Sequence, residues 1–395
     1  MPRVDDDAGP FVRDVTTTDE RGWRVVRYHY ALAEAAHAIR DVETASASGA
    51  MLVAPPSTWL LHPDAETPGL FRLHVTADGG STFVASTHPA ADGSPDTYEA
   101  RADTLDGAGF AAFGRFHVET VTSGAAQVLV AISPTGLALT DAEVAAWAKS
   151  AVDAIGGYLR GTFPVRRTLV VVEGRGGGGA VRGETIGEGG PSVLLRAGPS
   201  LTRATVRSDW VMTHELIHVV LPSMTRDHMW LTEGIPTYVE PIARTRAGLM
   251  APEQMWKELV EGVPQGLPEP GDQGLEKTHT WGRTYWGGSL FCFLADVRIR
   301  EATGNARSFD DAIRGIVATG ADVESHWEMP QLLEVGDRAT GTHVLADLYA
   351  EHGLARTDVD LPALWRRLGV SVEGGHVRFD DAAPLAAVRR GIAGR

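Results

Sequence analysis

The sequence predicts an α+β protein with a β-rich front, a mixed middle part and a mostly helical end. Residues 24–30, 69–75 and 127–132 alternate or cluster β-branched and aromatic residues between Gly, Pro, Asp and Ser, which is typical of antiparallel strands. From residue 208 onward, apolar residues recur mostly at helical spacing, with Gly and Pro breaks. We therefore expect a β-rich N-terminal domain, a central domain and a mostly helical C-terminal part, at residues 1–135, 136–300 and 301–395.

Individual elements follow from the same patterns. An Ala-rich run at residues 31–40 predicts a short helix within the β-rich part. A long helix is expected from Thr140, which forms a capping-box pattern with Glu143, to near Gly161, before Pro164. Further secondary structure is expected as two buried strands and a closing hairpin, at residues 168–172, 191–195 and around 373–375.

Composition and charge narrow the class of protein. The chain has 395 residues, of which 43% are hydrophobic, so it is long enough to bury a large core. With 36 Lys and Arg against 51 Asp and Glu, its formal net charge is −15, which argues against binding to nucleic acid. The single cysteine, Cys292, excludes an internal disulfide framework and a zinc cluster built from cysteines. A metal would have to sit mainly on His, Asp and Glu.

Neither a membrane span nor an export signal is expected from the sequence. It has no run of 18 or more apolar residues, and no basic segment followed by an apolar one opens the chain. As read, it predicts a cytoplasmic protein, or a secreted or periplasmic one if the N-terminus is processed or mis-started. The oligomeric state is left open.

The most informative segment is His-Glu-Leu-Ile-His at residues 214–218. On a helix, His214 and His218 are four residues apart and share one face, so both imidazoles can reach one ion. Glu215 lies beside the first histidine and can hold a water in the open metal position. We expect Ser208 or Asp209 to cap this helix and Pro222 to end it.

A second segment, Trp-Leu-Thr-Glu-Gly-Ile-Pro-Thr-Tyr-Val-Glu at residues 230–240, offers the third ligand. We expect Thr232 to cap a helix that has Glu233 in its first turn and that Pro241 kinks or ends. Glu233 would complete a His, His, Glu set that leaves a fourth position to water. Thr237 and Glu240 share its face and could orient the ligands. His228 is the rival ligand, and we expect it at the surface or in a substrate cleft instead.

These two segments resemble the gluzincins, the zinc metallopeptidases of the thermolysin-like superfamily, and within them the aminopeptidase-like and glycyl-aminopeptidase-like branches and the bacterial peptidase MA-like domains. Thr-Tyr-Trp-Gly-Gly-Ser-Leu at residues 284–290 is similar to the segment whose tyrosine stabilises the oxyanion in that branch. The resemblance implies that residues 136–300 form a thermolysin-like zincin catalytic domain. It also implies one zinc ion on His214, His218 and Glu233, with Glu215 as general base and Tyr285 as oxyanion donor.

The resemblance implies hydrolysis of peptide bonds in a peptide or protein substrate, and it includes aminopeptidase activity as one option. The segment that reads a free amino terminus in the aminopeptidases is not present; in its place, residues 183–193 could form an edge strand beside a substrate or a plain loop. Trp281 and Trp286 flank Tyr285 and could line a pocket or serve packing. The alternatives are a binding protein with a structural or relic zinc site, and a zinc hydrolase of a non-peptide electrophile.

Overall fold

The structure, a computed structural model, describes residues 10–20, 23–39, 41–61, 69–176 and 181–394. The chain forms two compact units that alternate along the sequence, where the sequence predicts three consecutive segments. The first unit lies within residues 1–121, 127–145 and 167–204, and the second within 122–126, 146–166 and 205–395.

The front of the first unit is built from short antiparallel strands, as predicted. It contains a hairpin, a four-stranded sheet in the order β3-β4-β9-β6 and a three-stranded sheet in the order β5-β8-β7. The predicted short helix forms as α1. The elements are β1 (Val12–Glu20), β2 (Trp23–Tyr30), α1 (Leu32–Ala38), β3 (Ser46–Ser48), β4 (Met51–Ala54), α2 (Pro56–Trp59), β5 (Leu70–His74), β6 (Thr82–Ala85), β7 (His88–Pro89), β8 (Thr97–Arg101), η1 (Ala102–Thr104) and β9 (Ala111–Gly114).

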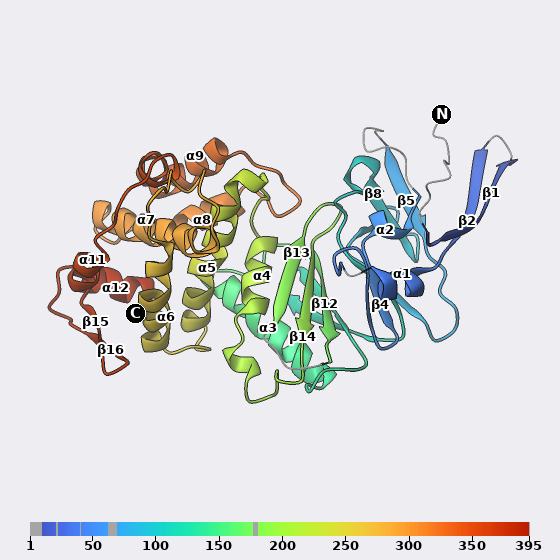
Figure 1. Ribbon diagram of the computed structural model, residues 1–395, viewed down its shortest axis with the longest axis horizontal. Helices are drawn as coiled ribbons and strands as arrows, with labels where there is room; N and C mark the ends of the chain where they lie inside the picture. Colours follow the sequence, from blue (N-terminus) through green and yellow to red (C-terminus); the bar gives the residue numbers. More distant parts are fainter. Residues whose placement is uncertain (1–9, 21–22, 40, 62–68, 177–180, 395) are drawn as a thin grey trace. The chain divides into compact units, whose positions relative to one another are not determined.

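A mixed five-stranded sheet completes the first unit (Figure 1). Its order is β10-β11-β12-β14-β13, and β12 pairs in parallel with both β11 and β14. The predicted buried strand at 168–172 lies inside β12, whose apolar residues are buried, as expected for a strand covered on both faces. The elements are β10 (His117–Ser123), β11 (Ala126–Ile132), β12 (Arg167–Gly174), β13 (Arg182–Ile186) and β14 (Ser192–Ala197).

One hydrophobic core joins this sheet to the strands before it. Leu169 and Val171 of β12 pack with Met51, Val53 and Phe110 of the β-rich front. Residue 135 therefore lies between strands that share one sheet and one core. β13 pairs antiparallel with β14 at the edge of the sheet, so the segment around residues 183–186 is a strand; its place beside a substrate stays a prediction.

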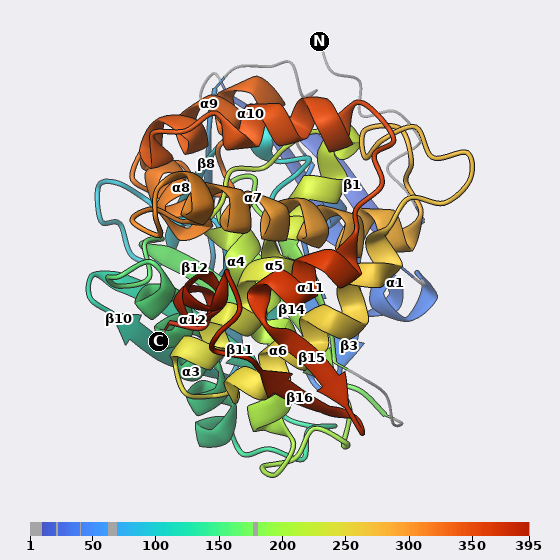
Figure 2. The ribbon, with the colours of Figure 1, turned by 90° about the vertical axis from the view of Figure 1, so that its left-hand side faces the viewer.

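The second unit is mostly helical, with a small hairpin beside α6 near its end (Figure 2). The α+β class with a β-rich front and a helical end is thus confirmed. α3 begins with the predicted capping box, in which the Thr140 amide donates to Glu143 and the Glu143 amide donates to Thr140. The elements are α3 (Asp141–Tyr158), η2 (Val206–Ser208), α4 (Val211–Val219), η3 (Arg226–His228), α5 (Met229–Arg246), α6 (Pro252–Gly262), η4 (Val263–Gly266), the π-helical turn η5 (Arg283–Gly287), α7 (Gly288–Ala302), α8 (Phe309–Val317), α9 (Met329–Thr340), α10 (Val344–Leu348), the π-helical turn η6 (Tyr349–Gly353), α11 (Leu361–Leu368), β15 (Val370–Glu373), β16 (His376–Phe379) and α12 (Ala386–Ile392).

The predicted closing hairpin is confirmed as β15 and β16. Gly374 and Gly375 form its two-residue turn and both have positive φ, at 58° and 80°. Such a turn requires left-handed backbone at both positions, which glycine adopts without strain.

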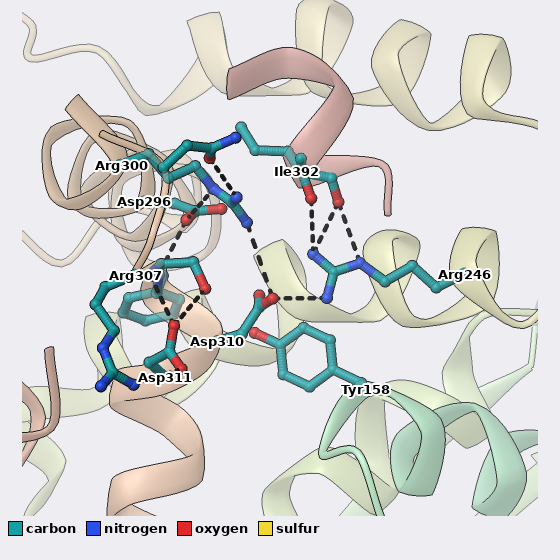
Figure 3. Close-up of polar contacts among 12 residues, drawn as sticks. Tyr158, Arg246, Asp296, Arg300, Arg307, Asp310, Asp311 and Ile392 are labelled. Carbon is teal, nitrogen blue, oxygen red and sulfur yellow. Dashed lines mark hydrogen bonds and ion pairs between the residues drawn. The ribbon is translucent and has the colours of Figure 1, made fainter. Parts of the chain in front are cut away.

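Helices α5, α7 and α8 are joined by buried charged groups (Figure 3). Asp296 of α7 accepts hydrogen bonds from the Tyr238 hydroxyl at 2.9 Å, from Arg300 Nε at 2.8 Å and from the Phe309 amide at 2.9 Å. Beside it, Arg246 of α5 pairs with Asp310 at 2.7 Å. Since buried charges are costly unless they are paired and hydrogen-bonded, each of these groups depends on the others.

In the described part of the chain, no helix combines the length and the apolar character that crossing a bilayer requires. Residues 1–9, on which the expectation about an export signal depends, lie outside the described residues.

We expect Asp296→Ala to lower the free energy of unfolding by about 3–5 kcal/mol, because it removes the shortest carboxylate contact of the buried Arg300 guanidinium and the acceptor of the Tyr238 hydroxyl. Denaturant unfolding measures this loss. The control is Arg338→Ala, which breaks an i,i+4 pair with Glu334 whose side chains are 64% and 75% exposed; it should change stability by less than about 1 kcal/mol. Equal effects of the two variants would contradict the role of the buried group.

Candidate metal centre

Helix α4 presents the two histidines of the motif on one side. It spans Val211–Val219, and Asp209, one of the two predicted caps, accepts a hydrogen bond through Oδ1 from the Met212 amide at 3.3 Å. The helix ends at Val219, shortly before Pro222, which was predicted to end it. The imidazole rings of His214 and His218 have their centroids 5.0 Å apart. The i,i+4 spacing therefore brings both rings to one place, because four residues make about one helical turn.

Helix α5 carries the third candidate ligand, but it begins earlier than predicted. It starts at Met229, so Glu233 lies in its second turn, and the Thr232 hydroxyl donates to the His228 carbonyl at 3.3 Å rather than capping a helix end. The helix also continues through Pro236 and Pro241 to Arg246. Nearly all of its residues after Gly234 are buried, and that packing outweighs the cost of the hydrogen bonds that the prolines cannot donate.

His214, His218 and Glu233 come together around a single point. Oε2 of Glu233 lies 3.2 Å from Nε2 of His214 and 3.6 Å from Nε2 of His218. One donor atom from each residue can be chosen so that all three lie within 4.8 Å of one another. Ligand atoms about 2.0–2.1 Å from a tetrahedral zinc are roughly 3.3 Å from each other. The observed separations fit an ion of that size, and a His, His, Glu set is a donor combination that zinc accepts.

The electrostatics of these three residues favour an ionised glutamate. Burial raises the pKa of Glu233, but the hydrogen bonds and charges of His214 and His218 outweigh burial and lower the pKa well below its usual range. Burial lowers the pKa of His218, whereas the contact with Glu233 raises it, and the net direction is upward. The carboxylate is thus held in the form that binds cations.

Glu215 and Tyr285 lie next to this cluster. Glu215 is buried on α4 between the two histidines in sequence. Burial, followed by the charges of Glu233 and Glu215, raises the pKa of Tyr285 to about 12. Tyr285 sits in the π-helical turn η5, an irregularity often found at functional sites, and it lines the same cavity as His214. Its hydroxyl is therefore a protonated donor at neutral pH.

His228 is not part of the three-residue cluster and does not line the cavity beside His214, and its side chain is 13% exposed. Its Nδ1 is 3.0 Å from both carboxylate oxygens of Glu276, and both side chains are nearly buried. Trp230 Nε1 also donates to Glu276, at 3.1 Å. This set of contacts ties the start of α5 to the segment before η5, which gives His228 a structural place that the sequence did not indicate.

Thr237 and Glu240 make contacts within α5 itself. The Thr237 hydroxyl donates to the backbone carbonyl of Glu233 at 2.7 Å, and Glu240 pairs with Arg244 at 2.8 Å. Both residues line the cavity that His214 also lines. Among the described residues, His214 Nδ1 is buried without a hydrogen-bond partner, so the proposed orienting role of Glu240 stays a prediction.

A close approach of two glycines fixes Glu233 relative to Tyr285. A Cβ atom on Gly288, at the start of α7, would lie 1.8 Å from the Trp230 carbonyl oxygen and 2.8 Å from the Gly234 Cα. The backbones of α5 and α7 therefore pass each other with no room for a side chain. Gly234 follows Glu233 directly, and Gly288 is three residues after Tyr285, so the crossing sets the distance between the two candidate functional groups.

Trp281 and Trp286 line the cavity beside the cluster, as one of the two readings of the sequence predicted. The sequence reasoning missed other lining residues, among them Trp210 and, on helix α6, Glu258 and Glu261. The only sequence pattern that could have indicated the two glutamates is their spacing of three residues on a strongly amphipathic helix. That spacing also describes an ordinary solvated face.

The chain is similar to known proteins in its fold but not in its sequence. No family model matches the chain, and no curated protein matches it in sequence. Among solved structures, it is similar to an aminopeptidase N family protein from Idiomarina loihiensis, with a TM-score of 0.64 and 12% identity over 88% of this chain and 65% of that one. It is also similar to an M1 zinc metallopeptidase from Deinococcus radiodurans, with a TM-score of 0.52 and 16% identity over 86% of this chain and 77% of that one.

A variant of the Deinococcus enzyme bound to a Tyr-Ser-Ala substrate has the same TM-score of 0.52 and 16% identity. These likenesses show that the chain has the fold of these metallopeptidases, as the resemblance of its motifs to the gluzincins implied. The chain spans 65% of the length of the Idiomarina protein.

We expect Gly288→Ala to destabilise the second unit by about 3 kcal/mol, because the added Cβ forces α5 and α7 apart. Thermal and denaturant unfolding measure the change. The matched control is Gly157→Ala in α3, where a Cβ meets nothing within 4 Å; it should be neutral or stabilising by up to about 1 kcal/mol. A Gly288→Ala protein as stable as the wild type would show that the crossing is not tight.

Proposed function

We propose that the protein is a zinc-dependent hydrolase of peptide bonds, with one zinc ion held by His214, His218 and Glu233. The observation that carries the proposal is the position of one Glu233 oxygen, 3.2 Å and 3.6 Å from the Nε2 atoms of the two histidines. A structural zinc site has four protein ligands, whereas the described residues contribute three here, which leaves a position for water or substrate. The fold that the chain shares with zinc metallopeptidases supports the same conclusion.

Zinc, when bound, supplies a Lewis acid that polarises a carbonyl and lowers the pKa of a water. Glu215 accepts the proton of the attacking water and later delivers it to the leaving amine. The Tyr285 hydroxyl, whose pKa is raised to about 12, donates a hydrogen bond to the carbonyl oxygen as it becomes negative. Since Tyr285 keeps its proton at neutral pH, it serves as a donor and not as a base.

Two variants separate metal binding from proton transfer. His218→Ala should lower the zinc content, measured by elemental analysis after dialysis, from about one ion per chain to background, because two ligands hold zinc poorly. The control is His376→Ala, on the exposed hairpin, which should keep its zinc. Glu215→Gln should keep zinc but lose about a thousandfold in kcat. A Glu215→Gln protein with full activity would contradict the assignment of the base.

A panel of peptides with free and with blocked amino termini tests the aminopeptidase prediction. Cleavage confined to free termini identifies an aminopeptidase, and cleavage of blocked peptides identifies an endopeptidase. A chelator should abolish either activity, and added zinc should restore it. No cleavage of any peptide by the zinc-loaded protein would contradict the proposed function and favour a binding protein.

A further inference from the structure

A cavity of about 430 Å³ opens beside the candidate metal centre. His214 and Tyr285 line it, so it begins at the place where the reacting carbonyl would lie under the proposed function. Its other walls come from Thr237, Glu240 and Pro241 of α5, and from α6 and the segment around η5. The volume is sufficient for one large side chain.

Three tryptophans form the aromatic part of this cavity. Trp210 and Trp281 are 50% and 63% exposed, which is unusual for indole rings that could bury a large apolar area. The ring centroids of Trp281 and Tyr285 are 5.6 Å apart. Trp286 packs so closely on α6 that a Cβ on Gly262 would lie 2.0 Å from it. Two of the indole rings are thus open to a ligand, and the third, Trp286, is held by close packing.

The charged part of the cavity is negative. Of the described residues that line it, three are glutamates, at positions 240, 258 and 261, and none is Lys or Arg. Glu240 is balanced by Arg244 at 2.8 Å, and Glu261 has Lys257 at 3.9 Å. Glu258 accepts a hydrogen bond at 3.0 Å from Gln254, whose amide is neutral. Burial and, among other groups, the charge of Glu258 raise the pKa of Glu240 to about 8, so Glu240 contributes little negative charge near neutral pH. Among the described residues, Glu258 is then the lining carboxylate that has no cationic partner.

Indole rings that line one cavity with the Glu258 carboxylate match one natural side chain best. A guanidinium is planar, stays charged, stacks on tryptophan and bonds carboxylates through two parallel donors. A lysine ammonium lacks the plane, and a neutral aromatic or aliphatic side chain would cover Glu258 without pairing it.

We propose that this cavity, the tryptophan pocket, is the subsite that receives the side chain of a substrate residue next to the scissile bond, and that it selects arginine. This proposal rests on the proposed function, because it assumes that the ligand of the pocket is a substrate, but the recognition of arginine can be tested separately. The substrate class that it names is peptides with arginine at the bond that is cleaved.

The test compares arginine with citrulline, which has nearly the same shape and no charge. Peptides carry Arg, citrulline, Leu or Glu in turn on each side of the scissile bond, and kcat/KM is measured with the zinc-loaded wild type. At one of the two positions, arginine should exceed citrulline by about tenfold or more, and glutamate should be the poorest.

Glu258→Gln should reduce the arginine-to-citrulline ratio about tenfold, because it removes the carboxylate and keeps the shape of the side chain. The matched control is Glu253→Gln, on the exposed side of the same helix, which should leave the ratio unchanged. Unfolding curves of both variants establish that α6 is intact. A ratio near one in the wild type, or the same ratio in Glu258→Gln, overturns the selection of arginine while leaving the peptidase proposal standing.

A binding measurement decides the case in which no peptide is cleaved. Titration with arginine amide and with citrulline amide, followed by the fluorescence of the pocket tryptophans, should give at least about tenfold tighter binding of arginine amide. Glu258→Gln should remove that difference. Equal affinities overturn the proposal, whereas a preference for arginine without cleavage supports the pocket and contradicts the proposed function.

Discussion

The crossing of α5 and α7 at Gly234 and Gly288 is the contact on which the arrangement of the candidate site depends. One residue before the first glycine lies Glu233, and three residues before the second lies Tyr285. Because a Cβ on Gly288 would lie 1.8 Å from a backbone oxygen of α5, the two helices can keep this close contact only with glycine at that position. The buried network around Asp296 joins the same two helices one to two turns after the glycines, and so also stabilises their crossing.

Several carboxylates of the second unit lie at the candidate metal centre and in the cavity beside it. Glu233 is held ionised between two histidines, Glu215 is buried beside them, and the tryptophan pocket, at whose border His214 and Tyr285 lie, adds further carboxylates. Buried carboxylates are costly without partners. In the two proposals, a zinc ion pairs with Glu233, and the guanidinium of a substrate pairs with Glu258 in the adjoining cavity.

Local elements were largely predictable. The strands around 127–132 and 168–172, the capping box at Thr140, the α4 helix and the closing hairpin each depend on residues close in sequence, so their patterns could be read directly. The start of α5 could not be read in this way, since its N-terminus is set by contacts of His228 and Trp230 with Glu276, which is more than forty residues away. Its passage through two prolines likewise depends on burial that only the fold provides.

By itself, the sequence determined which residues could bind a metal: two histidines on one helical face, and a glutamate in a motif that resembles the gluzincin pattern. Only the tertiary structure decided that one Glu233 oxygen faces both imidazoles, and that Trp210 and Glu258 meet Tyr285 around one cavity. The physical reason is that spacing along a helix fixes neighbours within one turn, whereas contacts between helices depend on how closely their backbones can pack.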